Sequence, residues 1–114
     1  MLKADYFSLV LEIAQKLGIS EQSQVFALDI LRRAREKRVT AGRHPAGLAA
    51  AALYIGCLQG NHERVTQQKL ADAAGVCCVV VRRDYILFWK KLDLPLPDFF
   101  EQQYIQRRDR NFDI

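Results

Sequence analysis

Two adjacent arginines, Arg82 and Arg83, have the side chains in this sequence that are best suited to recognising a ligand. A guanidinium group can hydrogen-bond the O6 and N7 atoms of guanine, or it can hold a phosphate group. Val79 lies three residues before Arg82, so on a helix the two side chains share a face. A valine at that place can pack against a thymine methyl group. This pattern predicts contacts to bases in a groove of DNA.

A second group of candidate residues lies upstream, around the start of a helix that we expect at Gln67. Arg64 precedes this helix and is placed to hold backbone phosphate, as are the main-chain N–H groups near Thr66 and Gln67. The residues predicted to bind DNA are therefore Val79, Arg82, Arg83, Arg64, Thr66 and Gln67.

The other reactive residue types do not form a recognisable site. The three cysteines, Cys57, Cys77 and Cys78, are odd in number and two are adjacent, which argues against a disulfide framework. Together with His44 and His62 they form no CxxC or HxxxH spacing, so we expect no metal site. Each histidine is expected to be solvated or to cap a helix. No nucleophile–base pair and no glycine-rich phosphate loop has supporting spacing, so we expect neither an enzyme nor a cofactor.

The chain that must position the candidate residues has 114 residues, the size of one domain. Half of the residues are hydrophobic, which is enough for a packed core. Lys and Arg outnumber Asp and Glu by 17 to 13, and the net charge of +4 suits a phosphate-rich partner without identifying one. The longest apolar run, residues 46–58, is too short to span a bilayer and predicts a buried helix.

Apolar residues recur at three- and four-residue steps, which predicts an all-α fold. Gly18 is expected to end the first helix and Ser20 to cap the second, which becomes basic over residues 32–38. The expected core positions of the first helix are Leu2, Tyr6, Leu9, Ile13 and Leu17. Those of the second helix are Val25, Leu28 and Leu31, with Phe26 and Ile30 widening the stripe.

The second half of the chain is expected to contain the central helix and the candidate site. Residues 39–44 read as a loop, and Pro45 suits the first position of a helix over residues 45–58. That helix is apolar on nearly every side, so it belongs at the centre of the domain. We expect two further helices, at residues 67–74 and 78–91, and a last one after Asp98.

The segment from residue 67 to residue 83 has the features of a helix-turn-helix. Ala71 is small where the two helices would cross, and Gly75 follows four residues later at the turn. Such a unit places its second helix in the major groove. The core-facing residues are expected to be Leu70, Ala74, Val76 and Val81, and the outer face of the second helix to contain Val79, Arg82, Arg83, Ile86 and Lys90. The alternative is a helix–glycine–helix corner that binds no nucleic acid, with solvated arginines and an Asp84 that would repel phosphate if it faced outward.

In their order, these elements resemble one cyclin-like repeat of the transcription factor IIB family, which includes archaeal transcription factor B. The strongest local matches are HPAGLAAAALYIG (residues 44–56), TQQKLADAAGV (residues 66–76) and VVVRRDY (residues 79–85). The resemblance implies five helices around a central third one. The resemblance covers about residues 6–92. We expect the repeat to occupy residues 1–94, with the helix-turn-helix at about 66–91, and residues 95–114 to form a helical C-terminal extension.

The resemblance also implies a function and partners. In that family the second repeat reads the element just upstream of the TATA box, and Val79 and Arg82 match its base-contacting valine and arginine by position. The implied partners are double-stranded promoter DNA and the TATA-binding protein, in the cytoplasm of an archaeon or the nucleus of a eukaryote. RNA polymerase is expected only through an N-terminal zinc ribbon, which this sequence lacks along with the first repeat. We therefore expect a piece of a longer factor or a stand-alone relative.

A protein–protein interaction module is the alternative function. Cyclin-like folds also bind kinases and other regulators, and the basic second helix would then meet an acidic partner surface. Salt-sensitive binding to DNA with a sequence preference would distinguish the two functions.

Overall fold

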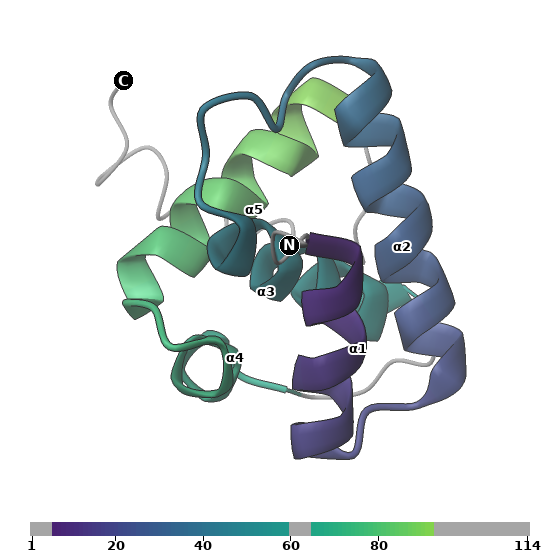
Figure 1. Ribbon diagram of the computed structural model, residues 1–114, viewed down its shortest axis with the longest axis vertical. Helices are drawn as coiled ribbons and strands as arrows, with labels where there is room; N and C mark the ends of the chain where they lie inside the picture. Colours follow the sequence, from purple (N-terminus) through teal and green to yellow (C-terminus); the bar gives the residue numbers. More distant parts are fainter. Residues whose placement is uncertain (1–5, 60–64, 93–114) are drawn as a thin grey trace, which may run out of the picture.

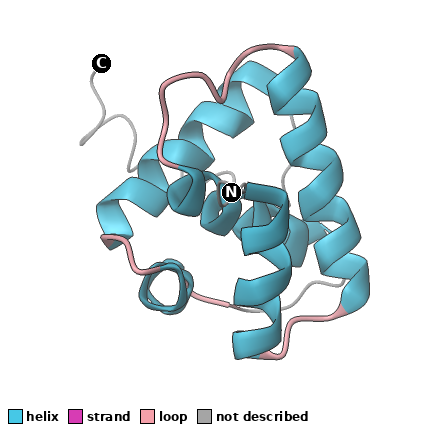
Figure 2. Ribbon diagram, viewed as in Figure 1, coloured by secondary structure: helices cyan, strands magenta, loops and turns pink. Residues whose placement is uncertain are grey.

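The computed structural model describes residues 6–59 and 65–92 (Figure 1). These residues form five helices and no strand, which confirms the all-α prediction (Figure 2). The helix expected after Asp98 and the candidate Arg64 lie outside the described residues. The helices are α1 (Tyr6–Leu17), α2 (Glu21–Glu36), α3 (Pro45–Gln59), α4 (Gln67–Ala74) and α5 (Cys78–Leu92).

Helix α3 is the centre of the fold, as its composition predicted. It contacts α1, α2, α4 and α5, and Figure 1 shows the other helices arranged around it. The four consecutive alanines from Ala49 to Ala52 are completely buried. Since a methyl group is the only side chain at these positions, the surrounding helices can approach α3 closely from several sides.

Two glycines of α3 mark the places where other helices come nearest. A Cβ atom at Gly56 would collide with the main-chain oxygen of Ser23 in α2. A Cβ atom at Gly47 would lie 2.6 Å from Val80 Cγ1 and 2.8 Å from Asp84 Oδ2, both in α5. These glycines therefore set the distance of α2 and α5 from the central helix.

The core face of α2 differs from the predicted one. Val25 and Phe26 were expected to face the core, but their side chains are 59% and 38% exposed. The buried positions are Ser23, Ala27, Ile30, Leu31 and Ala34. The physical reason is the close crossing at Gly56, which favours small side chains such as Ala27 on the contacting face.

The core face of α1 is also rotated slightly from the prediction. Ile13 is buried as expected, but its buried neighbours are Val10 and Ala14, whereas Leu9 and Leu17 are only half-buried. The helix ends where predicted, because Gly18 adopts a left-handed φ of 68°. No helix among the described residues is long and apolar enough to cross a membrane.

Candidate nucleic-acid interface

Helix α4 begins and ends at the residues that the sequence predicted. The Thr66 hydroxyl accepts a hydrogen bond of 3.1 Å from the Lys69 N–H, which is the usual N-cap arrangement. At the other end, Gly75 has a left-handed φ of 74°, and the Val76 N–H donates to the Ala71 carbonyl. This tight turn directs the chain from α4 into α5.

The crossing of α4 and α5 buries the small and apolar residues that a helix-turn-helix requires. Leu70, Ala71 and Val81 are completely buried, whereas Ala74 and Val76 are half-buried. Both helices also pack on α3, so α5 is held from two sides. In the first two turns of α5, Val80 and Asp84 lie against Gly47 of α3.

One side of α5 faces the core and the other faces solvent. Tyr85 and Phe88 are completely buried, as predicted, and the Tyr85 ring meets the ring of Tyr54 edge-on at a centroid distance of 4.9 Å. Ile86 was placed on the outer face, but it is only 6% exposed. This prediction was wrong. It divided the helix into a core face and an opposite outer face, but neighbouring helices also cover residues at the edge of the core face.

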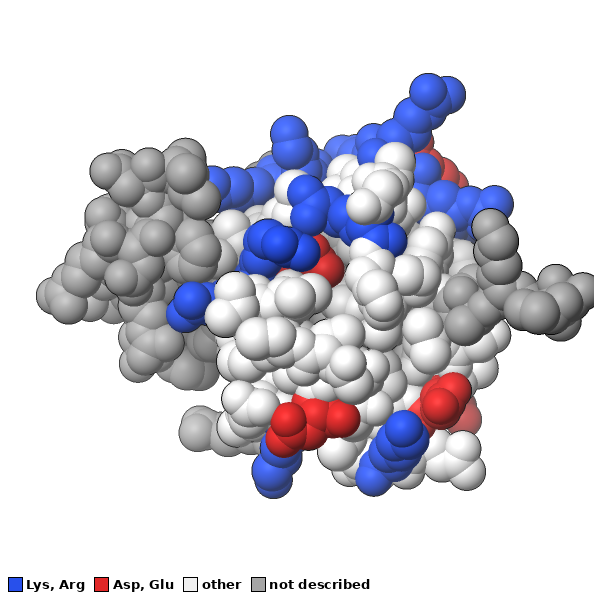
Figure 3. All heavy atoms as spheres, turned by 60° about the vertical axis from the view of Figure 1, so that its left-hand side comes forward, with Lys and Arg blue, Asp and Glu red and all other residues white. Residues whose placement is uncertain are grey.

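The structure brings five of the six predicted contact residues into the same unit. Val79, on the first turn of α5, is 56% exposed. Arg82 is half-buried, and the Arg83 side chain is 61% exposed. Thr66 is exposed and Gln67 half-buried at the start of α4, whereas Arg64 lies outside the described residues. Figure 3, which turns α4 and α5 toward the viewer, shows Lys and Arg gathered over the upper half of this face.

Asp84 does not face outward, which removes the repulsion considered from the sequence. It is 1% exposed, and its Oδ1 atom lies 3.2 Å from Arg43 Nη1 and 3.9 Å from Arg83 Nε. Burial raises the pKa of the Asp84 carboxyl above its ordinary value, although the charges of Arg43 and Arg83 oppose that shift. The carboxylate thus links α5 to the loop that precedes α3.

Arg43 is a residue of this region that the sequence reasoning gave no role. It lies 41 positions from Asp84 in the chain, so no local pattern could have paired them. The neighbouring His44 accepts a hydrogen bond of 3.3 Å at Nδ1 from the Ala46 N–H, and it therefore caps α3, one of the two roles expected of it. No group of three or more metal-ligating side chains occurs in the part of the chain that is described.

Comparison with known proteins agrees with this architecture. A family profile described as "Transcription factor TFIIB repeat" matches residues 3–91. The chain belongs to the transcription factor IIB family. A transcription initiation factor IIB from Sulfurisphaera tokodaii is 44% identical over 89 residues, which cover 78% of this chain and 29% of that protein. A second, from Pyrodictium occultum, is 47% identical over 88 residues, or 77% of this chain and 28% of the relative.

These relatives are general transcription initiation factors and not enzymes, which agrees with the lack of catalytic patterns in the sequence. A third relative, from Methanopyrus kandleri, is 49% identical over 63% of this chain and 23% of its own length. The chain thus spans less than a third of the length of these curated relatives. The resemblance to a cyclin-like repeat of the transcription factor IIB family is confirmed by the matched profile.

Proposed function

We propose that this repeat is a promoter-binding module, in which the first turns of α5 enter the major groove upstream of a TATA box. Val79 and Arg82 read bases, Arg83 assists them, and the start of α4 at Thr66 and Gln67 holds the phosphate backbone. Arg64 is proposed as a further phosphate contact from its place in the sequence. The mechanism is binding alone, with no bond made or broken.

The observation that best supports this proposal is that Val79 is 56% exposed on the same helix as Arg82 and Arg83, while the opposite side of that helix is buried. A thymine methyl group is a suitable contact for a valine at this position. The buried Asp84 also supports the proposal, since the one carboxylate in this turn of α5 is withdrawn from the surface and paired with cations. Phosphate can then approach Arg83 without meeting an exposed acid on the same turn.

The partners follow from the family. We propose that the repeat binds promoter DNA together with the TATA-binding protein, and that full specificity needs both that protein and the other repeat of the family. Alone, it should bind DNA non-specifically with a dissociation constant of about 10⁻⁴ to 10⁻⁶ M at physiological salt. RNA polymerase is proposed as a partner only for a longer protein that includes the N-terminal parts of the family.

The test is fluorescence anisotropy with a labelled duplex that contains a TATA box and a purine-rich upstream element, with and without TATA-binding protein. Arg82→Ala removes a base contact, so it should weaken specific binding by about 1–3 kcal/mol and relax the preference at one base pair. The matched control is Arg32→Ala, which removes the same charge from α2 and should leave the sequence preference intact.

The outcomes separate the proposed roles. If Arg82→Ala weakens binding equally for all sequences and lowers the salt dependence by about one phosphate contact, Arg82 holds phosphate and does not read bases. If binding is indifferent to both the upstream element and Arg82, the promoter-binding proposal is wrong. The protein–protein interaction module would then be the better description of this repeat.

A further inference from the structure

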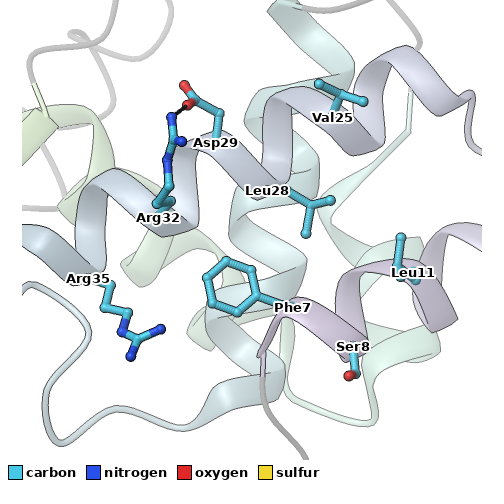
Figure 4. Close-up of a pocket in the computed structure, with 8 residues that line it drawn as sticks. All are labelled: Phe7, Ser8, Leu11, Val25, Leu28, Asp29, Arg32 and Arg35. Carbon is cyan, nitrogen blue, oxygen red and sulfur yellow. Dashed lines mark hydrogen bonds and ion pairs between the residues drawn. The ribbon is translucent and has the colours of Figure 1, made fainter.

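A groove between α1 and α2 lies outside the helix-turn-helix. It has a volume of about 690 Å³ and is lined by residues from both helices (Figure 4). The lining residues are Phe7, Ser8, Leu11, Val25, Leu28, Asp29, Arg32 and Arg35. We propose that this groove binds an amphipathic helix of a partner protein, with apolar side chains along one face and acidic side chains at one end.

The floor of the groove is apolar and is not covered by the described part of the chain. Leu11 is 50% exposed and Val25 is 59% exposed. Figure 4 shows these two side chains near one end, with Phe7 and Leu28 in the middle. Among the described residues four large apolar side chains are exposed, and all but Val79 lie on α1 or α2. The apolar side chains of a partner helix can pack against such a strip.

The other end of the groove is basic. Arg32 pairs with Asp29, the single carboxylate that lines the groove, and Arg33 pairs with the same carboxylate. Within the described residues Arg35 has no ion pair, and Figure 4 shows its guanidinium group at the groove beside Phe7. A partner that pairs with this end of the groove must therefore present negative charge.

The length and shape of the groove favour a helical occupant. Val25 and Arg35 are ten positions apart in α2, which corresponds to about 15 Å along the axis, or about three helical turns. Two neighbouring helices form the walls, and an amphipathic helix can lay its apolar face into such a groove. Its leucine-like side chains would contact Leu11 and Val25, and its carboxylates would pair with Arg35.

The surroundings argue against the other occupants. The phosphate backbone of DNA would meet the apolar floor formed by Phe7, Leu11 and Val25. A second copy of this chain could not satisfy Arg35 from the same surface, because the groove's one carboxylate, Asp29, is already paired with two arginines. The proposal does not rest on the promoter-binding function, since none of its residues lies on α4 or α5.

The test measures binding of the full chain to fluorescein-labelled 14-residue helical peptides by anisotropy. One acidic peptide has leucines three and four residues apart over two turns and glutamates in its last turn. A second has the glutamates in its first turn, and a charge-reversed version of each has lysines in their place. We expect one of the acidic peptides to bind at least about fivefold more tightly than its lysine version.

Two groove variants and two controls make the test specific. Val25→Ser should weaken binding of the acidic peptide by about tenfold, because it removes an apolar contact. Arg35→Gln should weaken it by about threefold, whereas Lys37→Gln, which loses the same charge at the same helix end, should have little effect. Val79→Ser should impair DNA binding and leave peptide binding unchanged, so the two functions can fail separately. These side chains are exposed, and thermal unfolding would verify that each variant remains folded.

Several results would overturn the proposal. It is wrong if neither acidic peptide binds, if the lysine versions bind equally well, or if Val25→Ser and Val79→Ser have the same effect on the peptide. Displacement of the peptide by duplex DNA at equal affinity would assign the groove to nucleic acid. Self-association that Val25→Ser abolishes would assign it to a second copy of the chain.

Discussion

Substitution of Gly47 by alanine would test whether the close contact between α3 and α5 positions the recognition helix. The added Cβ atom would lie 2.6 Å from Val80 Cγ1, about 1 Å inside ordinary carbon–carbon contact, and 2.8 Å from Asp84 Oδ2. Overpacking of this kind costs about 1–3 kcal/mol. The higher helix propensity of alanine offsets at most about 1 kcal/mol of this cost. We therefore expect the free energy of unfolding to fall by about 1–2 kcal/mol.

Thermal unfolding followed by circular dichroism at 222 nm measures this effect. For a domain of this size, the loss corresponds to a decrease in Tm of about 5–15 °C. Because the clash is with a side chain of α5, Val80→Ala in the same chain should recover part of the loss. The free energy of unfolding lost by the double variant should be about 1 kcal/mol smaller than the sum of the losses in the two single variants.

The refuting results are equally specific. If Gly47→Ala unfolds at or above the wild-type temperature, α5 does not approach α3 as closely as described. If the effects of Gly47→Ala and Val80→Ala simply add, the loss does not arise from contact between these two residues. In the promoter assay, Gly47→Ala should also weaken specific binding, since it displaces the turn of α5 that contains Val79.

Two further predictions concern the other close contacts of the fold. Gly56→Ala should lower the free energy of unfolding by about 2–3 kcal/mol, because its Cβ meets the main chain at Ser23, which cannot rotate away as a side chain can. A loss no larger than that of Gly47→Ala would contradict this reasoning. Burial raises the pKa of Asp84, so the folded chain binds its proton more tightly than the unfolded chain does, and protonation favours folding. The Tm of the wild type should therefore rise relative to that of Asp84→Asn as the pH falls from 7 toward 3.8, the ordinary pKa of aspartate. A Tm difference that stays constant with pH would show that burial does not raise the pKa of this carboxyl.

Local sequence patterns predicted most of the helix boundaries, because local interactions determine them. Thr66 and Gly75 limit α4 through hydrogen bonds to residues no more than five positions away. Gly18 ends α1 because its backbone adopts a left-handed conformation that other residues avoid. These residue types have the same preferences in any chain, so the first and last residues of α4 matched the prediction.

The composition of α3 likewise determined its central place. A helix without a polar face cannot lie at the surface of a soluble domain, so the others had to pack around it. The helix-turn-helix was predictable for the same reason, since a small residue, a turn glycine and flanking apolar positions lie within one short segment. The candidate contacts Val79 and Arg83 are exposed because the core stripe of α5, which the periodicity revealed, occupies the opposite side of the helix.

Only the tertiary structure decided which faces the peripheral helices bury and which charges meet. The spacing of apolar residues placed Val25 and Phe26 in the core, but the approach of α2 to Gly56 selects the smaller Ala27 and leaves both of these side chains exposed. The sequence left open whether Asp84 faces outward, and packing on α3 buries it against Arg43, which is 41 positions distant. The local sequence determines how each segment folds. Which segments pack against each other depends on contacts between residues that are far apart in the chain.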